Sequence, residues 1–251
     1  MTFAFHPTRL STRRQWLQHS AGWLGAPALL GLAGCASAPV FEAPPASVVI
    51  APLKAGQQLR FNVTNLYNGL SVGTASYTAE AASANGSQRI AVSLPSSYVA
   101  LQDGSTQRSG VLLMTDRFHA SEELFFDEPY RFDRPDRLLP DQLALGAGAV
   151  LENSYVRSGA HRSLRWATRV SGEGWERITV PAGTFLSLRV QRSIWFDHPD
   201  LGWRRNNMRS DTLWFAPTLG FWVRREWTGE YLVPDVRRDL RKEDWVRFEL
   251  V

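Results

Sequence analysis

Residues 175–196 read WERITVPAGTFLSLRVQRSIWF. The flanking segments 175–180 and 185–196 are rich in β-branched and aromatic side chains, which favour strands. Between them, Pro181 and Gly183 favour a tight turn, and Gly183 can adopt the positive φ that such a turn needs. This stretch therefore predicts a β-hairpin, which joins two antiparallel strands.

The chain from residue 48 to residue 251 repeats this pattern as a single β-rich domain. Further strands are predicted at 59–63, 70–80, 88–94, 109–120, 149–159, 162–174 and 245–251, with a second hairpin at 211–227 that turns at 216–220. The predicted fold class is mainly β: a curved antiparallel sheet or partial barrel with one or two short helices. A closed barrel and a sandwich fit the same pattern.

Two segments depart from the strand pattern. Residues 127–141 contain three prolines and many charges, which predicts a long loop. Residues 234–244 begin with a proline and place Val236 and Leu240 one turn apart on one face, with charged residues over the rest. This arrangement predicts a helix.

The first 34 residues have the order basic, apolar, small that is typical of a signal peptide. The apolar stretch 21–34 is too short to span a bilayer permanently, and it contains Pro27. Arg13 and Arg14 lie in TRRQWL, which resembles the twin-arginine export motif. The alternative is an ordinary basic region of the general secretion route.

Leu32, Ala33, Gly34 and Cys35 resemble the lipobox of bacterial lipoproteins. The resemblance implies a diacylglyceryl thioether on Cys35 and cleavage before it, whereas the alternative is a buried apolar cysteine. Residues 35–47 would then be the lipidated cysteine and an Ala/Pro tether. Ala36 rather than Asp follows the cysteine. By resemblance to enterobacterial lipoprotein sorting, this implies the periplasmic side of the outer membrane, with the inner membrane as the alternative.

Composition argues against nucleic acid as a partner. The net charge of +4 falls to +1 without the first 34 residues, since these carry three arginines and no acid, leaving 25 basic and 24 acidic side chains. A nearly neutral chain has no general attraction for phosphate. One cysteine also excludes an intrachain disulfide and a four-thiolate metal site.

Tryptophan is the most unusual feature of the domain. Eight tryptophans follow residue 34, all between residues 166 and 245. The predicted ligand-binding residues are Trp166, Trp195, Trp214 and Trp222, because wide aromatic faces near arginine suit acyl chains or sugars. The alternative is that these rings fill a large β core.

Catalytic signatures are weak, and neither a cofactor nor a resident metal is expected. The sequence has no G-x-x-x-x-G-K-[ST] phosphate loop and no G-x-S-x-G nucleophile elbow. Two acidic groups with a histidine could support a hydrolase; they are Asp197, His198 and Asp200, and Asp116, His119, Glu122 and Glu123. For the first group a polar turn after a strand is the favoured interpretation.

Three motifs carry a family resemblance: VPAGTF at 180–185, WFAP at 214–217 and LLP at 138–140. Over residues 135–228 the chain resembles a group of uncharacterised bacterial envelope lipoproteins. These distantly resemble the lipoprotein-localisation superfamily, in which a curved antiparallel half-barrel wraps a helix or a lipid-like ligand. The resemblance implies a similar fold and, by analogy, a hydrophobic ligand.

The leading hypothesis is a non-enzymatic, membrane-anchored periplasmic lipoprotein. It would bind a hydrophobic or amphipathic ligand, lipid-like or glycan, or an envelope protein, through a Trp-rich sheet face. One alternative is an envelope hydrolase acting on glycan or lipid. Another is a structural subunit of an envelope complex.

Overall fold

The computed structural model describes residues 40–95, 107–115, 117–125, 128–157, 161–197, 207–232, 240–242 and 245–251. The body formed from Val40 onward is a single unit, and the predicted signal peptide and Cys35 lie outside the described residues. Its strands are β1 Gln58–Asn65, β2 Ser71–Ala79, β3 Gln88–Pro95, β4 Gln107–Met114, β5 His119–Phe125, β6 Glu128–Arg137, β7 Gly146–Arg157, β8 Leu164–Val180, β9 Gly183–Phe196, β10 Asn207–Ala216, β11 Phe221–Leu232, β12 Leu240–Lys242 and β13 Val246–Leu250.

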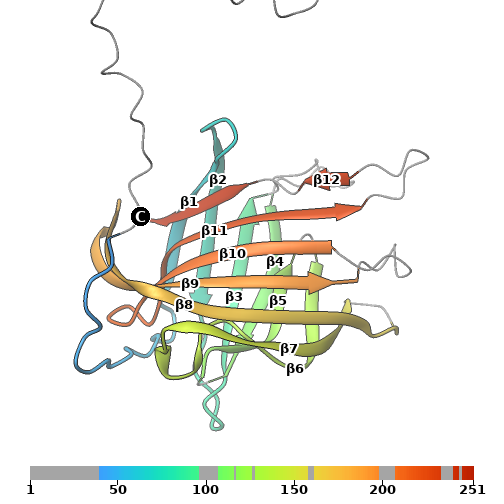
Figure 1. Cartoon of the computed structure of the whole chain (residues 1–251), viewed down its shortest axis with the longest axis horizontal. Helices are drawn as coiled ribbons and strands as arrows, with labels where there is room; N and C mark the ends of the chain where they lie inside the picture. Colours follow the sequence, from blue (N-terminus) through green and yellow to red (C-terminus); the bar gives the residue numbers. More distant parts are fainter. Residues whose placement is uncertain are drawn as a thin grey trace, which may run out of the picture. The chain divides into compact units, whose positions relative to one another are not determined.

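The strands form one closed antiparallel barrel (Figure 1). Neighbours in sequence pair from β1 to β11, and β13 closes the ring by pairing with both β11 and β1. The ring contains twelve of the thirteen strands, because β12 pairs only with β11. Mainly antiparallel β structure is thus confirmed, and the sheet is closed rather than partial.

Alternation of apolar and polar residues explains which side of each strand faces the interior. In β1, Leu59, Phe61 and Val63 are buried while the residues between them are exposed. In β13, Val246 and Phe248 point inward in the same way, opposite Asn65 and Val63 of β1. Sequence periodicity predicted both strands correctly.

The hairpin that turns at Gly183 is the longest in the barrel. β8 runs unbroken through the two predicted segments 162–174 and 175–180, with a register shift between Gly172 and Gly174. A Cβ at Gly172 would stand 2.2 Å from the Ala144 oxygen. Glycine therefore lets a neighbouring backbone approach the bulge.

The predicted loop at 127–141 is wrong, because most of it is strand β6. Its prolines are compatible with a strand here. Pro129 stands at the strand start, and Pro135 falls in the irregular stretch where the β5 pairing passes from Glu122–Arg131 to Ala120–Asp136. In the described part of this segment Arg131, Asp133 and Arg134 are exposed, whereas Asp136 is buried.

Two other boundaries differ from prediction. The predicted strand 109–120 is a hairpin: β4 ends at Met114, and β5 begins at His119. Within the predicted helix 234–244, Leu240–Lys242 form strand β12 against β11, and the other residues lie outside the described part. The only helical element in the described residues is the short 3-10 turn η1, Asp141–Leu143, so this part of the chain offers no helix that could span a bilayer.

Part of the predicted tether lies against the barrel. Glu42 donates its backbone N–H to the Trp175 oxygen at 2.6 Å, and its carboxylate pairs with Arg177 at 3.1 Å. Phe41 packs so closely over Gly174 that a Cβ there would stand 2.3 Å from its ring. The described body therefore begins at Val40, before the predicted boundary at residue 48.

Candidate functional site

The four tryptophans predicted to bind a ligand lie on different sides of the barrel wall. Trp166 and Trp222 are buried inside. Trp195 is half-buried on the outer face, since Ile194 and Phe196 on either side of it are buried. Trp214 also faces outward. No common surface joins these four rings, so ligand binding through them remains a prediction.

Trp214 shows how the outer wall holds an aromatic ring. The guanidinium carbons of Arg189 and Arg224 stand 5.4 and 5.5 Å from its ring centroid. The indole N–H donates to the Glu176 carboxylate at 2.5 Å. Cation–π contacts and this hydrogen bond occupy the ring with the protein's own residues.

The predicted acidic groups do not form one cleft among the described residues. The Asp197 carbonyl accepts a hydrogen bond from the Tyr155 hydroxyl at 2.7 Å. His119 and Glu123 belong to two different sites, described below. Within the described ranges no three His, Cys, Asp or Glu side chains are placed to hold a metal ion. The predicted residues outside those ranges are Arg13, Arg14, Leu32, Ala33, Gly34, Cys35, Asp116, His198 and Asp200.

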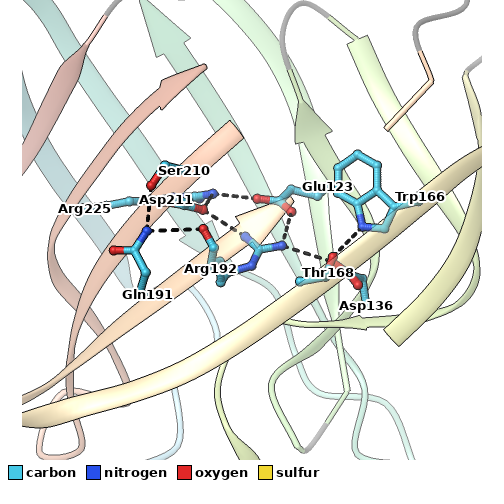
Figure 2. Close-up of polar contacts among 9 residues, drawn as sticks. All are labelled: Glu123, Asp136, Trp166, Thr168, Gln191, Arg192, Ser210, Asp211 and Arg225. Atoms are coloured by element: carbon cyan, nitrogen blue, oxygen red, sulfur yellow. Dashed lines mark hydrogen bonds and ion pairs between the residues drawn. The ribbon is translucent and has the colours of Figure 1, made fainter. Parts of the chain in front are cut away.

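Five charged side chains meet inside the barrel in a cluster that sequence reasoning did not predict. This interior ion cluster consists of Glu123 on β5, Asp136 on β6, Arg192 on β9, Asp211 on β10 and Arg225 on β11. Figure 2 shows them pointing toward one another from these strands. All five are at most 4% exposed, so the cluster is closed to solvent.

Each guanidinium in the cluster bridges several carboxylates. Arg192 contacts Asp211 at 2.9 Å, Asp136 at 3.1 Å and Glu123 at 3.3 Å. Arg225 contacts Asp211 and Glu123, both at 2.7 Å. Because Glu123 is 69 residues from Arg192 and 102 from Arg225 in sequence, these bonds tie distant strands together. The cluster is therefore a structural link across the barrel.

The three carboxyl groups of the cluster differ in the direction in which their pKa values are shifted. Burial alone would raise the pKa of Glu123 and Asp211, but Arg192 and Arg225 more than offset it, so both pKa values are lowered. For Asp136 burial dominates over the attraction of Arg192, and its pKa is raised. Of the three carboxyl groups, Asp136 is therefore the one that holds a proton most readily.

Two consecutive hydrogen bonds connect Asp136 to Thr168 and Trp166. Thr168 Oγ1 donates to Asp136 Oδ2 at 3.1 Å and accepts the indole N–H of Trp166 at 2.8 Å (Figure 2). The Trp166 ring is enclosed by aromatic side chains of Tyr130, Phe132, Tyr155 and Phe196. Trp166 is thus a core residue that also satisfies the buried polar network.

A groove opens at the barrel end where several turns meet. Its polar chamber has a volume of about 580 Å³ and carries the side chains of Arg117, His119, Arg137 and Asp141. Arg137 pairs with Asp141 at 2.9 Å, and His119 Nε2 stands 3.8 Å from the same carboxylate. With both arginines, the neutral histidine and one carboxylate, the chamber has a net positive charge.

An apolar chamber of about 270 Å³ adjoins the polar one. Leu53, Met114 and Pro52 line it, and Ile50 and Phe118 line both chambers. We call the two together the end groove. Its two parts differ in polarity, and they share a wall.

Residues 50–53 cross this end of the barrel as a strap. Ala51 donates its N–H to the Pro217 oxygen at 2.8 Å, and Gln88 donates to the Leu53 oxygen at 3.1 Å. Gly220, at φ +70°, lies so close that a Cβ would stand 1.9 Å from the Ala51 oxygen. The strap is held by the β10–β11 turn, and it carries Ile50 into the end groove.

Backbone strain is concentrated at the polar chamber. In the described part of the chain the non-glycine residues with positive φ are Phe118, Gln142 and Leu143, at 57°, 54° and 55°, and all three line this chamber. Such conformations cost about 1–2 kcal/mol per residue and gather at functional sites. Burial and the charge of Arg137 lower the pKa of His119, which keeps the ring neutral near pH 7.

No protein-family model matches the chain, and no curated protein matches it. Three solved structures are similar at low identity. One, described as an exported protein with a YmcC-like fold from Bacteroides fragilis, is 16% identical, with 81% of this chain and 98% of that one covered and a TM-score of 0.45. A second, described as a lipoprotein from Parabacteroides distasonis, is 15% identical, with 81% and 97% covered and a TM-score of 0.47.

The third is the hypothetical lipoprotein YmcC from Escherichia coli, at 11% identity, with 77% of this chain and 82% of that one covered and a TM-score of 0.40. Because all three TM-scores lie below 0.5, these similarities carry no weight for function.

The sequence did contain a pattern from which part of the interior ion cluster could have been predicted. Arg192 is in phase with the inward residues Leu188, Val190 and Ile194 of β9, and Asp211 is in phase with Leu213. A charged residue in an inward position predicts a buried partner. The end groove gave no such signal, because its walls come from separate turns.

Proposed function

We propose that this chain is a lipid-anchored protein of the bacterial envelope that holds an amphipathic ligand in the end groove. The ligand has an anionic head group and an apolar tail, and the protein performs no chemistry on it. The observation that carries the proposal is the contact between the positively charged chamber and the apolar chamber through Ile50 and Phe118.

The polar chamber suits the head group. Asp141 partners Arg137, so the Arg117 guanidinium provides the net positive charge. Guanidinium groups bind carboxylate or phosphate oxygens through paired N–H donors. Gln142 and Leu143, held in strained backbone conformations, shape the far wall.

The apolar chamber suits the tail. Leu53, Met114 and Phe118 present carbon surface, and removal of an acyl chain from water contributes about 0.8 kcal/mol per CH₂. A volume of about 270 Å³ is near the lower end for small-molecule sites. One slender chain therefore fits the chamber better than a bulky ring system.

Anchoring is proposed from the N-terminal sequence. A signal peptide over residues 1–34, export through Arg13 and Arg14, and lipidation of Cys35 in LAGC support attachment to a membrane outside the cytosol. Ala36 supports the periplasmic side of the outer membrane.

Binding of a fluorescent fatty acid tests the groove. The protein is residues 35–251 with Cys35→Ser, and the probes are dansyl-labelled undecanoate and the corresponding uncharged alcohol. Removing both chamber arginines with Arg117→Gln and Arg137→Gln should weaken undecanoate binding about tenfold or more, since a hydrogen bond to a charged group contributes about 1.5–3 kcal/mol. Alcohol binding should change little.

The matched control removes two arginines from outer-wall ion pairs, with Arg165→Gln and Arg247→Gln. This control should bind both probes like the parent protein, whereas Leu53→Asp should weaken both. Absence of saturable binding in the parent, or equal loss in the control, would contradict the proposal. Loss on replacing Trp195 or Trp214 instead would place the ligand on the outer wall and overturn the proposal.

A further inference from the structure

Exposed apolar side chains occur in chain segments that adjoin those lining the end groove. They are Val40, Phe41, Val48, Val49 and Leu145, which we call the end face. Val40 and Val49 are both 83% exposed. Valine side chains this open to water are costly for an isolated protein, and a group of them marks a contact surface.

Contacts on the barrel place these residues together. Phe41 lies against Gly174, and the backbone around Leu145 lies against Gly172, so both adjoin the β8 bulge. Val48 and Val49 directly precede Ile50, which lines both chambers of the end groove. Leu145 follows the η1 turn, whose residues line the polar chamber.

The chain itself indicates what covers the end face. Val40 is five positions after Cys35, so the two Cα atoms can be at most about 18 Å apart. An acyl chain on Cys35 would hold the end face near a bilayer. Arg117, which provides the net positive charge of the polar chamber, would favour a surface of anionic lipid head groups.

We infer that the end face docks on a lipid bilayer, so that the end groove opens directly into the lipid surface. An amphipathic ligand then enters with its tail from the membrane and its head group beside Arg117. This inference rests on the proposed lipid anchor and groove ligand. It adds the surface by which the protein meets the membrane.

Vesicle binding without the anchor tests the docking. The protein is residues 35–251 with Cys35→Ser, and the vesicles are phosphatidylethanolamine with phosphatidylglycerol. Co-sedimentation should fall about fivefold or more with Val48→Ser and Val49→Ser, because apolar area is lost from the contact. The matched control is Tyr67→Ser and Leu70→Ser, which removes two apolar side chains that are 57% and 65% exposed at the β1–β2 turn. It should co-sediment like the parent protein.

The single cysteine allows a direct readout. In the Cys35→Ser background, Val49→Cys or Leu70→Cys provides a unique thiol for a nitrobenzoxadiazole label. Vesicles should shift the emission to the blue for the label at position 49 and not for the label at position 70. Equal shifts at the two positions, or no vesicle binding by the parent, would overturn the inference.

Two further measurements separate the possible outcomes. Binding of dansyl-labelled undecanoate without vesicles should be unchanged by Val48→Ser and Val49→Ser, so failed docking and a failed groove are distinguishable. Sedimentation equilibrium should show a monomer. A dimer that these two substitutions dissociate would assign the end face to a second copy of the chain and overturn docking on lipid.

Discussion

Arg225 binds Asp211 inside the barrel through two hydrogen bonds, from Nε to Oδ1 at 3.0 Å and from Nη2 to Oδ2 at 2.7 Å. The same Oδ2 accepts a bond from Arg192 at 2.9 Å. One carboxylate therefore compensates two buried guanidinium groups. Both arginines also contact Glu123 on β5. Asp211 holds the two guanidinium groups in place for these contacts, which join distant strands of the barrel.

Replacement of this carboxylate should be among the most destabilising single changes in the barrel. Asp211→Asn removes the carboxylate that pairs with both Arg192 and Arg225 and leaves Glu123 as the only partner with a lowered pKa. Breaking a buried ion pair costs about 3–5 kcal/mol. Urea unfolding at pH 7 measures the loss. Glu152→Gln is the control, since its pair with Arg165 is exposed and contributes below about 1 kcal/mol. Equal losses would show that the cluster does not stabilise the fold.

The pH dependence of stability should depend on Asp136. Its pKa is raised by burial, so the folded state favours the protonated carboxyl. That stabilisation is present below the unfolded pKa of about 4 and is lost as pH rises through the folded pKa. Asp136→Asn does not titrate. Its free energy of unfolding should therefore increase relative to wild type as pH rises, measured by urea unfolding across pH.

Glu123→Gln should show the opposite dependence. The pKa of Glu123 is lowered, because Arg192 and Arg225 outweigh burial. Its stabilisation is present above the unfolded pKa of about 4 and is lost as pH falls through the folded pKa. The deficit of the variant should shrink in acid. Parallel pH curves for the Asp136 and Glu123 variants would contradict the charge assignment.

Two glycines with nearly the same backbone conformation provide a test of the strap. Gly220 has φ +70°, and a Cβ there would stand 1.9 Å from the Ala51 oxygen, whereas Gly69 has φ +72° and a Cβ there would meet no atom within 4 Å. Alanine at either position costs about 1–2 kcal/mol of backbone strain. Gly220→Ala should lower the melting temperature further than Gly69→Ala and weaken probe binding in the end groove. Identical effects would mean that the strap contact is unimportant.

Lipidation should depend on one sulfur atom. Radiolabelled palmitate should label the full chain in bacteria, and Cys35→Ser should abolish the label, because the thioether needs the thiol. In cell fractionation the wild-type protein should appear in the membrane fraction and Cys35→Ser in the soluble fraction. Equal labelling of the serine variant would exclude Cys35 as the attachment site.

Local chemistry in the sequence was enough to predict the antiparallel β class and most hairpins. On both sides of Gly183 and of Gly220, strand-forming residues flank a short turn. The pairing of β8 with β9 and of β10 with β11 therefore follows from residues that are close in sequence. The loop prediction at 127–141 was wrong because it was based on the number of prolines and charged residues, which is typical of loops but does not exclude a strand. Pro135 sits instead at a pairing irregularity, which depends on strand β5.

Closure of the ring and the position of both sites depended on tertiary structure. β13 pairs with β1 although the two strands lie near opposite ends of the domain sequence. Local periodicity contains no information on that pairing. Asp136, Arg192 and Asp211 become a cluster only because the closed wall turns them toward one interior, where low polarity makes each charge require a partner. The end groove likewise exists only where the strap, two turns and η1 meet.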